Sequence, residues 1–168
     1  MNELALFAGA GGGILGTKLL GWRVVCAVEI DPYCREVLLR RQEEGVIEAF
    51  PIWDDVRTFD GKPWCGKVDV ITAGFPCQPF SVAGQQRGEA DERNMWPETI
   101  RVIQEVKPRY VLLENVPGIQ AYLPVVVRDL RRAGYTVKRP IELGADDVGA
   151  PHRRKRLWIV AHRNDSGD

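Results

Sequence analysis

The chain has 168 residues, a little more than one average domain uses, so we expect one domain and at most a short appendage. A hydrophobic fraction of 45% with 27% charged residues is ordinary for a globular protein and excludes extended disorder. The 23 basic and 23 acidic residues balance, which excludes a strongly basic nucleic-acid coat, and no stretch approaches the ~20 apolar residues of a membrane span.

The first apolar run, Leu4–Ala8, is predicted to be a strand, followed by a glycine turn and a helix through Leu20. This N-terminal region does not fit a secretory signal, because Glu3 precedes the run and five glycines interrupt it between Gly9 and Gly16. A signal peptide needs a basic start and a continuous apolar stretch. We therefore expect a cytoplasmic protein.

The next elements continue the alternation of strand and helix. Val24–Val28 is predicted to be a second strand, and Asp31 and Pro32 are typical of the N-cap and first turn of the helix that follows. Ile47–Ile52 is a candidate for a short third strand.

The second half of the chain repeats this pattern. Two more helices are predicted, Trp96–Val106 and Leu123–Ala133, the latter ended by Gly134. Alternating strands and helices indicate an α/β protein of the Rossmann-like type, with a mostly parallel sheet and helices on both faces. The remaining predicted strands are Val68–Ala73, Tyr110–Leu113, Thr136–Leu143 and Leu157–Ala161.

The cysteines and histidines do not form a metal-site pattern. The four cysteines contain no C-x-x-C pair, and the two histidines lie near the C-terminus, so we expect no structural zinc. In a reducing compartment the thiols stay free. Cys26 and Cys34 lie in apolar or helical patterns typical of inert core residues, whereas Cys77 lies in a different setting.

A glycine turn separates the first strand from its helix, in the sequence Phe7-Ala8-Gly9-Ala10-Gly11-Gly12-Gly13. Such a turn lets a ligand approach the backbone at a helix N-terminus. Roughly 20 residues later Glu29 follows the second strand, where a carboxylate can accept hydrogen bonds from ribose hydroxyls. Asp55, or less plausibly Asp54, could accept from an adenine amino group. These residues indicate a nucleoside-containing cofactor, with NAD and S-adenosylmethionine equally compatible.

Cys77 lies in the segment Gly74–Ser81, directly after the predicted strand Val68–Ala73. Open parallel sheets bind ligands at the carboxyl ends of their strands, so this thiol is expected at the mouth of the cofactor cleft. Pro76 and Pro79 bracket the cysteine and stiffen its loop. A thiolate on a rigid turn is a good soft nucleophile, although a buried structural cysteine is the simpler alternative.

Two further segments carry charged side chains at strand ends. Glu114 follows the strand Tyr110–Leu113, where a partly desolvated carboxyl could donate or share a proton as a general acid does. A basic run, His152–Arg156, leads into the last predicted strand and could bind a phosphate or a polarised carbonyl oxygen. The simpler alternatives are a solvated glutamate and a solvated basic surface.

Taken in this order, the four segments resemble the DNA cytosine-5 methyltransferase family. The shared motifs are Phe-Ala-Gly-x-Gly-Gly, Gly-Phe-Pro-Cys-Gln-Pro-Phe-Ser, Glu-Asn-Val and an Arg-x-Arg before the closing strand. The resemblance extends from Leu4 to about Ala161, and the block around Cys77 is its most specific part. Phe75 and Ser81 favour a DNA-type member over the tRNA-methylating relatives.

The resemblance implies a covalent mechanism on a cytosine flipped out of double-stranded DNA, with S-adenosyl-L-methionine as methyl donor and no metal. Cys77 would add to C6, Glu114 would contact N3 and the exocyclic amine, Arg156 would hold the carbonyl oxygen, and Arg154 would support the loop and the thiolate. The implied cofactor-binding residues are Phe7, Gly9, Gly11, Gly12, Glu29, Ile30, Asp55, Val56 and Pro76. The implied substrate-binding residues are Phe75, Gln78, Ser81, Gln85, Arg87 and Asn115, of which Gln85 and Arg87 lie in a segment expected to close over the base.

Complete members of this family continue with a target-recognition region and a Gly-Asn block, and neither pattern occurs in the 168 residues. We therefore expect residues 1–162 to form the catalytic domain, residues 163–168 to be a polar tail, and the target-recognition region to be absent. The resemblance also implies a bacterial or phage-encoded protein of restriction-modification type.

Three interpretations remain open from the sequence. The chain could be a methyltransferase core that needs a second chain for target recognition, or a decayed core that binds S-adenosylmethionine without methylating. The third is a nicotinamide-dependent oxidoreductase, which only the glycine turn and Glu29 favour.

Overall fold

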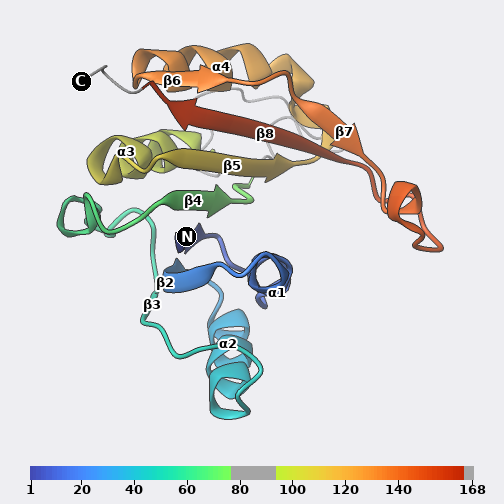
Figure 1. The fold of residues 1–168 in the computed structure, drawn as a ribbon. Coiled ribbons are helices and arrows are strands. Elements are labelled where there is room, and N and C mark those ends of the chain that lie inside the picture. Colours follow the sequence, from blue (N-terminus) through green and yellow to red (C-terminus); the bar gives the residue numbers. More distant parts are fainter. Residues whose placement is uncertain (77–93, 165–168) are drawn as a thin grey trace.

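The computed structural model describes residues 1–76 and 94–164 (Figure 1). Within these ranges the strands form one eight-stranded sheet in the order β3-β2-β1-β4-β5-β8-β6, with β7 paired to β8. Neighbouring strands among β1 to β5 are parallel, whereas β8 runs antiparallel to β5, β6 and β7. The predicted mostly parallel α/β sheet is confirmed.

The strands are β1 Asn2–Leu6, β2 Arg23–Val28, β3 Ile52–Trp53, β4 Val70–Ala73, β5 Tyr110–Asn115, β6 Tyr135–Val137, β7 Ile141–Leu143 and β8 Arg156–Arg163. The α-helices are α1 Gly12–Leu19, α2 Pro32–Glu43, α3 Trp96–Val106 and α4 Leu123–Arg132. Short 3₁₀ turns are η1 Lys62–Trp64, η4 Pro117–Ala121 and η5 Asp146–Val148.

Helix positions agree closely with the sequence patterns. Asp31 caps α2 as predicted, because its Oδ1 accepts hydrogen bonds from the backbone amides of Tyr33 at 2.8 Å and Cys34 at 3.1 Å. Helix α3 has the predicted bounds. Gly134, with φ +89°, follows the end of α4 in the left-handed conformation that glycine adopts readily.

Several strand predictions need correction. Strand β4 begins at Val70 rather than Val68, and β5 extends to Asn115, so Glu114 lies within this strand rather than after it. The first strand ends at Leu6 rather than Ala8, because Phe7 turns to φ +54°. The third strand comprises Ile52–Trp53 only, since just these residues pair with β2. The predicted strand Thr136–Leu143 is two strands, β6 and β7, which pair with opposite ends of β8 and are separated around Pro140, a residue with no amide hydrogen for the ladder.

Helices lie on both faces of the sheet, as predicted. On one face α3 and α4 pack against alternate residues of β5 and β8, such as Val111, Leu113 and Ile159, in the larger hydrophobic core. On the other face α1 and α2 cover β1 and β2, where a smaller core contains Ala5 and Leu38. Burial of each large aliphatic side chain in these cores stabilises the fold by about 1.5–3 kcal/mol.

The strand order determines where a ligand can bind. The chain proceeds from β1 through β2 to β3 on one side and then returns to β4 and β5 on the other side of β1. The order therefore reverses between β1 and β4, and ligands of such sheets bind at the carboxyl ends of the strands at this reversal. Across residues 1–76 and 94–164, no helix has the length and apolar character needed to cross a membrane.

Candidate active site

The glycine turn after β1 is shaped by left-handed backbone. Phe7, Gly9 and Gly11 have φ values of +54°, +54° and +86°. A Cβ at Gly11 would lie 2.7 Å from Cδ2 of Leu38, so both the conformation and the contact with α2 require glycine there. The turn thus leads directly into the N-terminus of α1, which begins at Gly12.

Glu29 connects this turn to the end of β2. Its side chain is buried, and its carboxylate accepts hydrogen bonds from the amide of Gly9 at 2.6 Å and the amide of Asp31 at 2.8 Å. The structure therefore brings together Gly9 and Glu29, two residues that the sequence predicted for one cofactor site. Ile30, beside Glu29, is 59% exposed.

The loop after β3 places Asp55 near the same edge. The amide of Glu29 donates to the carbonyl of Trp53 at 2.9 Å, two residues before Asp55. Asp55 forms an ion pair with Arg57 at 2.6 Å, and these hydrogen bonds lower the pKa of the Asp55 carboxyl. The next residue, Val56, is buried.

Arg101 of α3 holds this loop in place, and the sequence analysis did not identify it. Its guanidinium donates to the carbonyls of Val56 at 2.7 Å and Phe59 at 3.0 Å, and it pairs with Glu98 at 2.7 Å and Glu105 at 3.0 Å. The Glu-x-x-Arg-x-x-x-Glu spacing of Glu98, Arg101 and Glu105 signals the ion pairs but not the contact with a loop over 40 residues away.

The residues after β4 lead to the predicted nucleophile. Phe75 is buried and packs against Trp96 with ring centroids 5.3 Å apart, so the substrate contact that we expected of it would have to come from its main chain. The Phe75 carbonyl accepts a hydrogen bond from the side chain of Asn115 at 3.0 Å. Pro76 is the last residue before the gap in the described chain. Among the predicted site residues, Cys77, Gln78, Ser81, Gln85 and Arg87 lie outside the described residues.

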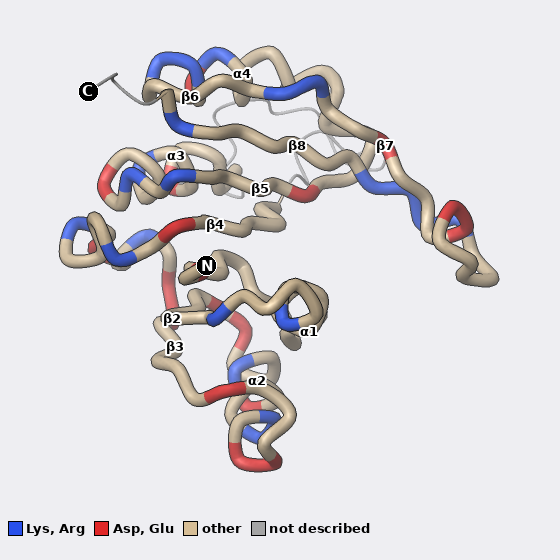
Figure 2. Tube along the Cα trace, in the orientation of Figure 1, with Lys and Arg blue, Asp and Glu red and all other residues tan. Residues whose placement is uncertain are grey.

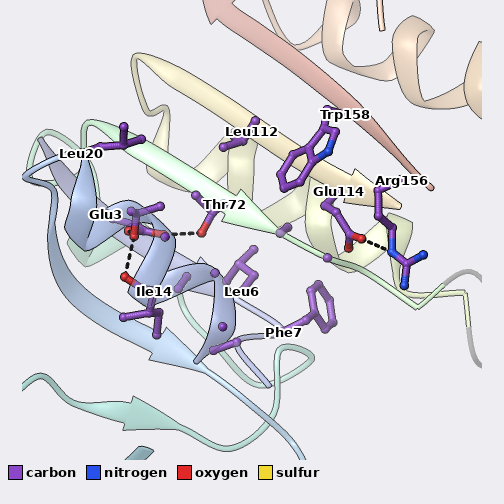
Figure 3. A pocket seen from close by; sticks show the side chains of 18 of the residues that line it. Glu3, Leu6, Phe7, Ile14, Leu20, Thr72, Leu112, Glu114, Arg156 and Trp158 are labelled. Atoms are coloured by element: carbon purple, nitrogen blue, oxygen red, sulfur yellow. Dashed lines mark hydrogen bonds and ion pairs between the residues drawn. The ribbon is translucent and has the colours of Figure 1, made fainter. Parts of the chain in front are cut away.

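Glu114 and Arg156 meet across the antiparallel pair of β5 and β8. The Glu114 Oε1 lies 2.5 Å from Nε of Arg156, with side chains 33% and 24% exposed (Figure 3). A Cβ at Gly74 would lie 3.1 Å from Glu114 Oε2, so the carboxylate rests against the end of β4. Figure 2 shows the basic stretch before β8 beside the acidic end of β5, and within it Arg154 has φ +25°.

A cavity of about 590 Å³ joins the glycine turn to this charged pair (Figure 3). Five predicted site residues contribute to its wall. The five residues are Phe7, Gly12, Glu114, Arg154 and Arg156. The other described site residues do not line it: Gly9, Gly11, Glu29, Ile30, Asp55, Val56, Phe75, Pro76 and Asn115. The predicted residues thus form two neighbouring groups, one around Glu29 and one around Glu114.

Glu3 lines the floor of this cavity, although the sequence analysis gave it no role in the site. The side chain is 0% exposed, and its carboxylate accepts hydrogen bonds from the hydroxyls of Thr17 at 2.5 Å and Thr72 at 2.6 Å. Burial raises the pKa of Glu3, against the lowering effect of these two hydrogen bonds. A charged residue within an otherwise apolar strand pattern was the available signal.

The strand order, with its reversal between β1 and β4 beside the glycine turn, defines a Rossmann-like α/β protein. No group of three or more His, Cys, Asp or Glu suited to a metal occurs in the part of the chain that the structure describes. The family model for C-5 cytosine-specific DNA methylases matches residues 1–168, and the chain belongs to this family of S-adenosylmethionine-dependent methyltransferases. This membership leaves the nicotinamide oxidoreductase interpretation without support.

Individual relatives agree with this assignment. The chain is 37% identical to the type II methyltransferase M.NgoMIV of Neisseria gonorrhoeae over 98% of its own length and 52% of the relative's. It is 38% identical to M.Eco47II of Escherichia coli, covering 98% of the chain and 40% of the relative. The crystal structure of S. pombe Dnmt2 methyltransferase superposes with a TM-score of 0.76 at 25% identity, covering 100% of this chain and 52% of that one. The chain thus spans about half the length of these relatives.

Proposed function

We propose that the chain is the catalytic core of a DNA methyltransferase that transfers the methyl group of S-adenosyl-L-methionine to C5 of cytosine. The observation that carries this proposal is the cavity that connects the glycine turn with Glu114, Arg154 and Arg156 at the reversal of strand order. A cofactor bound at the turn and a base held by the charged pair would then share one crevice.

The residues around the turn suit the cofactor. Glu29 already accepts from Gly9 and Asp31, and each carboxylate oxygen keeps lone-pair capacity for the ribose hydroxyls. In this proposal Asp55 accepts from the adenine amino group. The remaining contacts come from Phe7, Gly11, Gly12, Ile30, Val56 and Pro76. When bound, S-adenosylmethionine supplies an electrophilic methyl group.

The chain's own residues perform the activation of the base. The Cys77 thiolate adds to C6 of the flipped-out cytosine, and the electron pair of the C5–C6 bond becomes available at C5 for attack on the methyl carbon. Glu114 contacts N3 and the exocyclic amine, and Arg156, which holds Glu114 at 2.5 Å, binds the carbonyl oxygen. Arg154 supports this arrangement. A base then removes the C5 proton, and elimination frees Cys77 with its electron pair.

Contacts with DNA are proposed for the segment after β4. Residues Gln78, Ser81, Gln85 and Arg87, with the main chain of Phe75 and the strand end at Asn115, would hold the flipped nucleotide and its phosphates. Double-stranded DNA is therefore the proposed substrate, consistent with the type II methyltransferases among the relatives.

One sheet face suggests that further polypeptide completes the site. On the α1 side of β5 and β8, Leu112 and Trp158 line the cavity, and Val160, Ile141 and Leu143 are 38%, 53% and 43% exposed. An α-helix about 10 Å wide covers two strands spaced about 5 Å apart. We propose that an amphipathic helix from outside residues 1–168, in the same or a second chain, covers this face, and that the same polypeptide supplies target recognition.

Covalent trapping tests the proposed nucleophile. The chain is incubated with S-adenosylmethionine and a high concentration of duplex DNA containing 5-fluorocytosine, which blocks removal of the C5 substituent and retains the adduct. We expect an adduct with the native chain and with Cys65→Ser, which removes an exposed thiol. Cys77→Ser should abolish it. An adduct that survives in Cys77→Ser contradicts the mechanism, whereas cofactor binding without any adduct supports the alternative of an inactive core.

A further inference from the structure

Arg57 occupies the acceptor positions of Asp55. The Asp55 Oδ1 accepts from the backbone amide of Arg57 at 2.9 Å and from its Nε at 3.0 Å. The Oδ2 accepts from the same Nε at 3.0 Å and from Nη2 at 2.6 Å. A carboxylate offers about four lone-pair sites, so these contacts leave little capacity for another donor.

The backbone around Asp55 is held from several sides. The Asp55 carbonyl accepts from the amide and hydroxyl of Thr58, each at 3.1 Å, and the Thr58 hydroxyl accepts from Trp53 Nε1 at 3.0 Å. Arg101 binds the carbonyls of Val56 and Phe59, as described above. A new donor at Asp55 must therefore be accommodated by displacing the Arg57 side chain, which is 56% exposed, rather than by moving the loop.

We propose that Arg57 determines the purine specificity of the cofactor site by competing with the base for Asp55. This inference rests on the proposed function, in which Asp55 faces the six-position of adenine. The amino group of adenine is a donor that must displace a guanidinium N–H from the carboxylate. A six-oxo purine presents an acceptor oxygen at this position, to which the guanidinium of Arg57 can donate while it stays on Asp55.

The size of the effect follows from the exposure of the ion pair. Partly exposed pairs between Arg and a carboxylate are weak and screened by salt, so displacing Arg57 should weaken adenine binding about two- to fivefold. Without Arg57 the adenine amine meets an available carboxylate, and the six-oxo oxygen meets an uncompensated negative charge. Removing Arg57 should therefore raise affinity for adenine and lower affinity for the six-oxo base.

The experiment measures binding of S-adenosylhomocysteine and its six-oxo analogue S-inosylhomocysteine by calorimetry. It compares the native 168-residue chain with Arg57→Met, which retains the apolar stem. Arg23→Met is the matched control, because Arg23 forms an exposed ion pair with Glu48 at the opposite end of β2. Thermal unfolding of each variant confirms that it is folded.

We expect Arg57→Met to bind S-adenosylhomocysteine about two- to fivefold more tightly and to discriminate more strongly against the six-oxo analogue. Arg23→Met should behave as the native chain. Raising the salt concentration should tighten binding to the native chain but not to Arg57→Met. Equal discrimination in the native chain and Arg57→Met would overturn the role of Arg57 alone. Absence of binding to either compound in every folded variant would overturn the cofactor assignment as well.

Discussion

Replacing Arg101 with methionine should destabilise the protein and loosen the loop that carries Asp55. The Arg101 side chain is 32% exposed, and its guanidinium donates to the carbonyls of Val56 and Phe59 at 2.7 Å and 3.0 Å. Each of these two hydrogen bonds from a charged donor contributes about 1 kcal/mol in a partly exposed site, because its loss leaves a carbonyl without its donor. The ion pairs with Glu98 and Glu105 add about 1 kcal/mol at most. We expect a loss of about 2–3 kcal/mol in the free energy of unfolding.

Urea denaturation followed by circular dichroism measures this loss, and calorimetry with S-adenosylhomocysteine should show weaker binding. Arg101→Lys should recover only part of the stability, because a single ammonium cannot reach two carbonyls and two carboxylates together. Arg40→Met is the matched control, since the exposed pair of Arg40 with Glu36 is worth about 0.3–0.5 kcal/mol. If Arg101→Met lost no more stability than Arg40→Met, the assignment of Arg101 as the residue that holds this loop would be wrong.

Two further predictions concern residues beside the cavity. Burial raises the pKa of the Glu3 carboxyl above 4.5, so the folded state binds the carboxyl proton more tightly than the unfolded state does. The free energy of unfolding should therefore fall as pH rises from 4.5 through the folded pKa. Urea denaturation between pH 4.5 and about pH 8 should show Glu3→Gln gaining stability relative to the native chain as pH rises, and a relative loss would contradict the buried charge. Gly11→Ala should cost about 1–2 kcal/mol from its φ of +86°, and more from the contact with Leu38, in thermal unfolding. Gly13→Ala, with ordinary φ and nothing within 4 Å, should be neutral or slightly stabilising, so similar losses in both variants would disprove this reasoning.

Local patterns predicted most of the elements. The N-cap at Asp31 depends on residues within one turn, and the bounds of α3 follow from apolar residues at helical spacing, so both agree with the structure. The predicted strand Thr136–Leu143 was wrong because it ran through Pro140, a local signal that a ladder is interrupted, and its two halves pair with opposite ends of β8. Apolar residues alone do not indicate where a ladder is interrupted.

The site was predictable in composition and less so in contacts. The motifs singled out Glu114 and Arg156 as candidate site residues. Their ion pair forms because β8 lies antiparallel beside β5. The spacing of either motif does not encode this order of strands. The contact of Arg57 with Asp55 is local and could have been suspected from two residues of opposite charge two positions apart. The roles proposed for Cys77 and the residues after it remain predictions.

The sequence by itself determined the class of fold, the positions of the helices and the residue types available for chemistry, because these depend on periodicity and short-range hydrogen bonds. Only the tertiary structure decided that the glycine turn and the Glu114 pair share one cavity, that Glu3 lies buried beneath it and that Arg101 holds the loop after β3. Each of these contacts joins segments far apart in the chain, and their free energies become available only when the sheet brings those segments together.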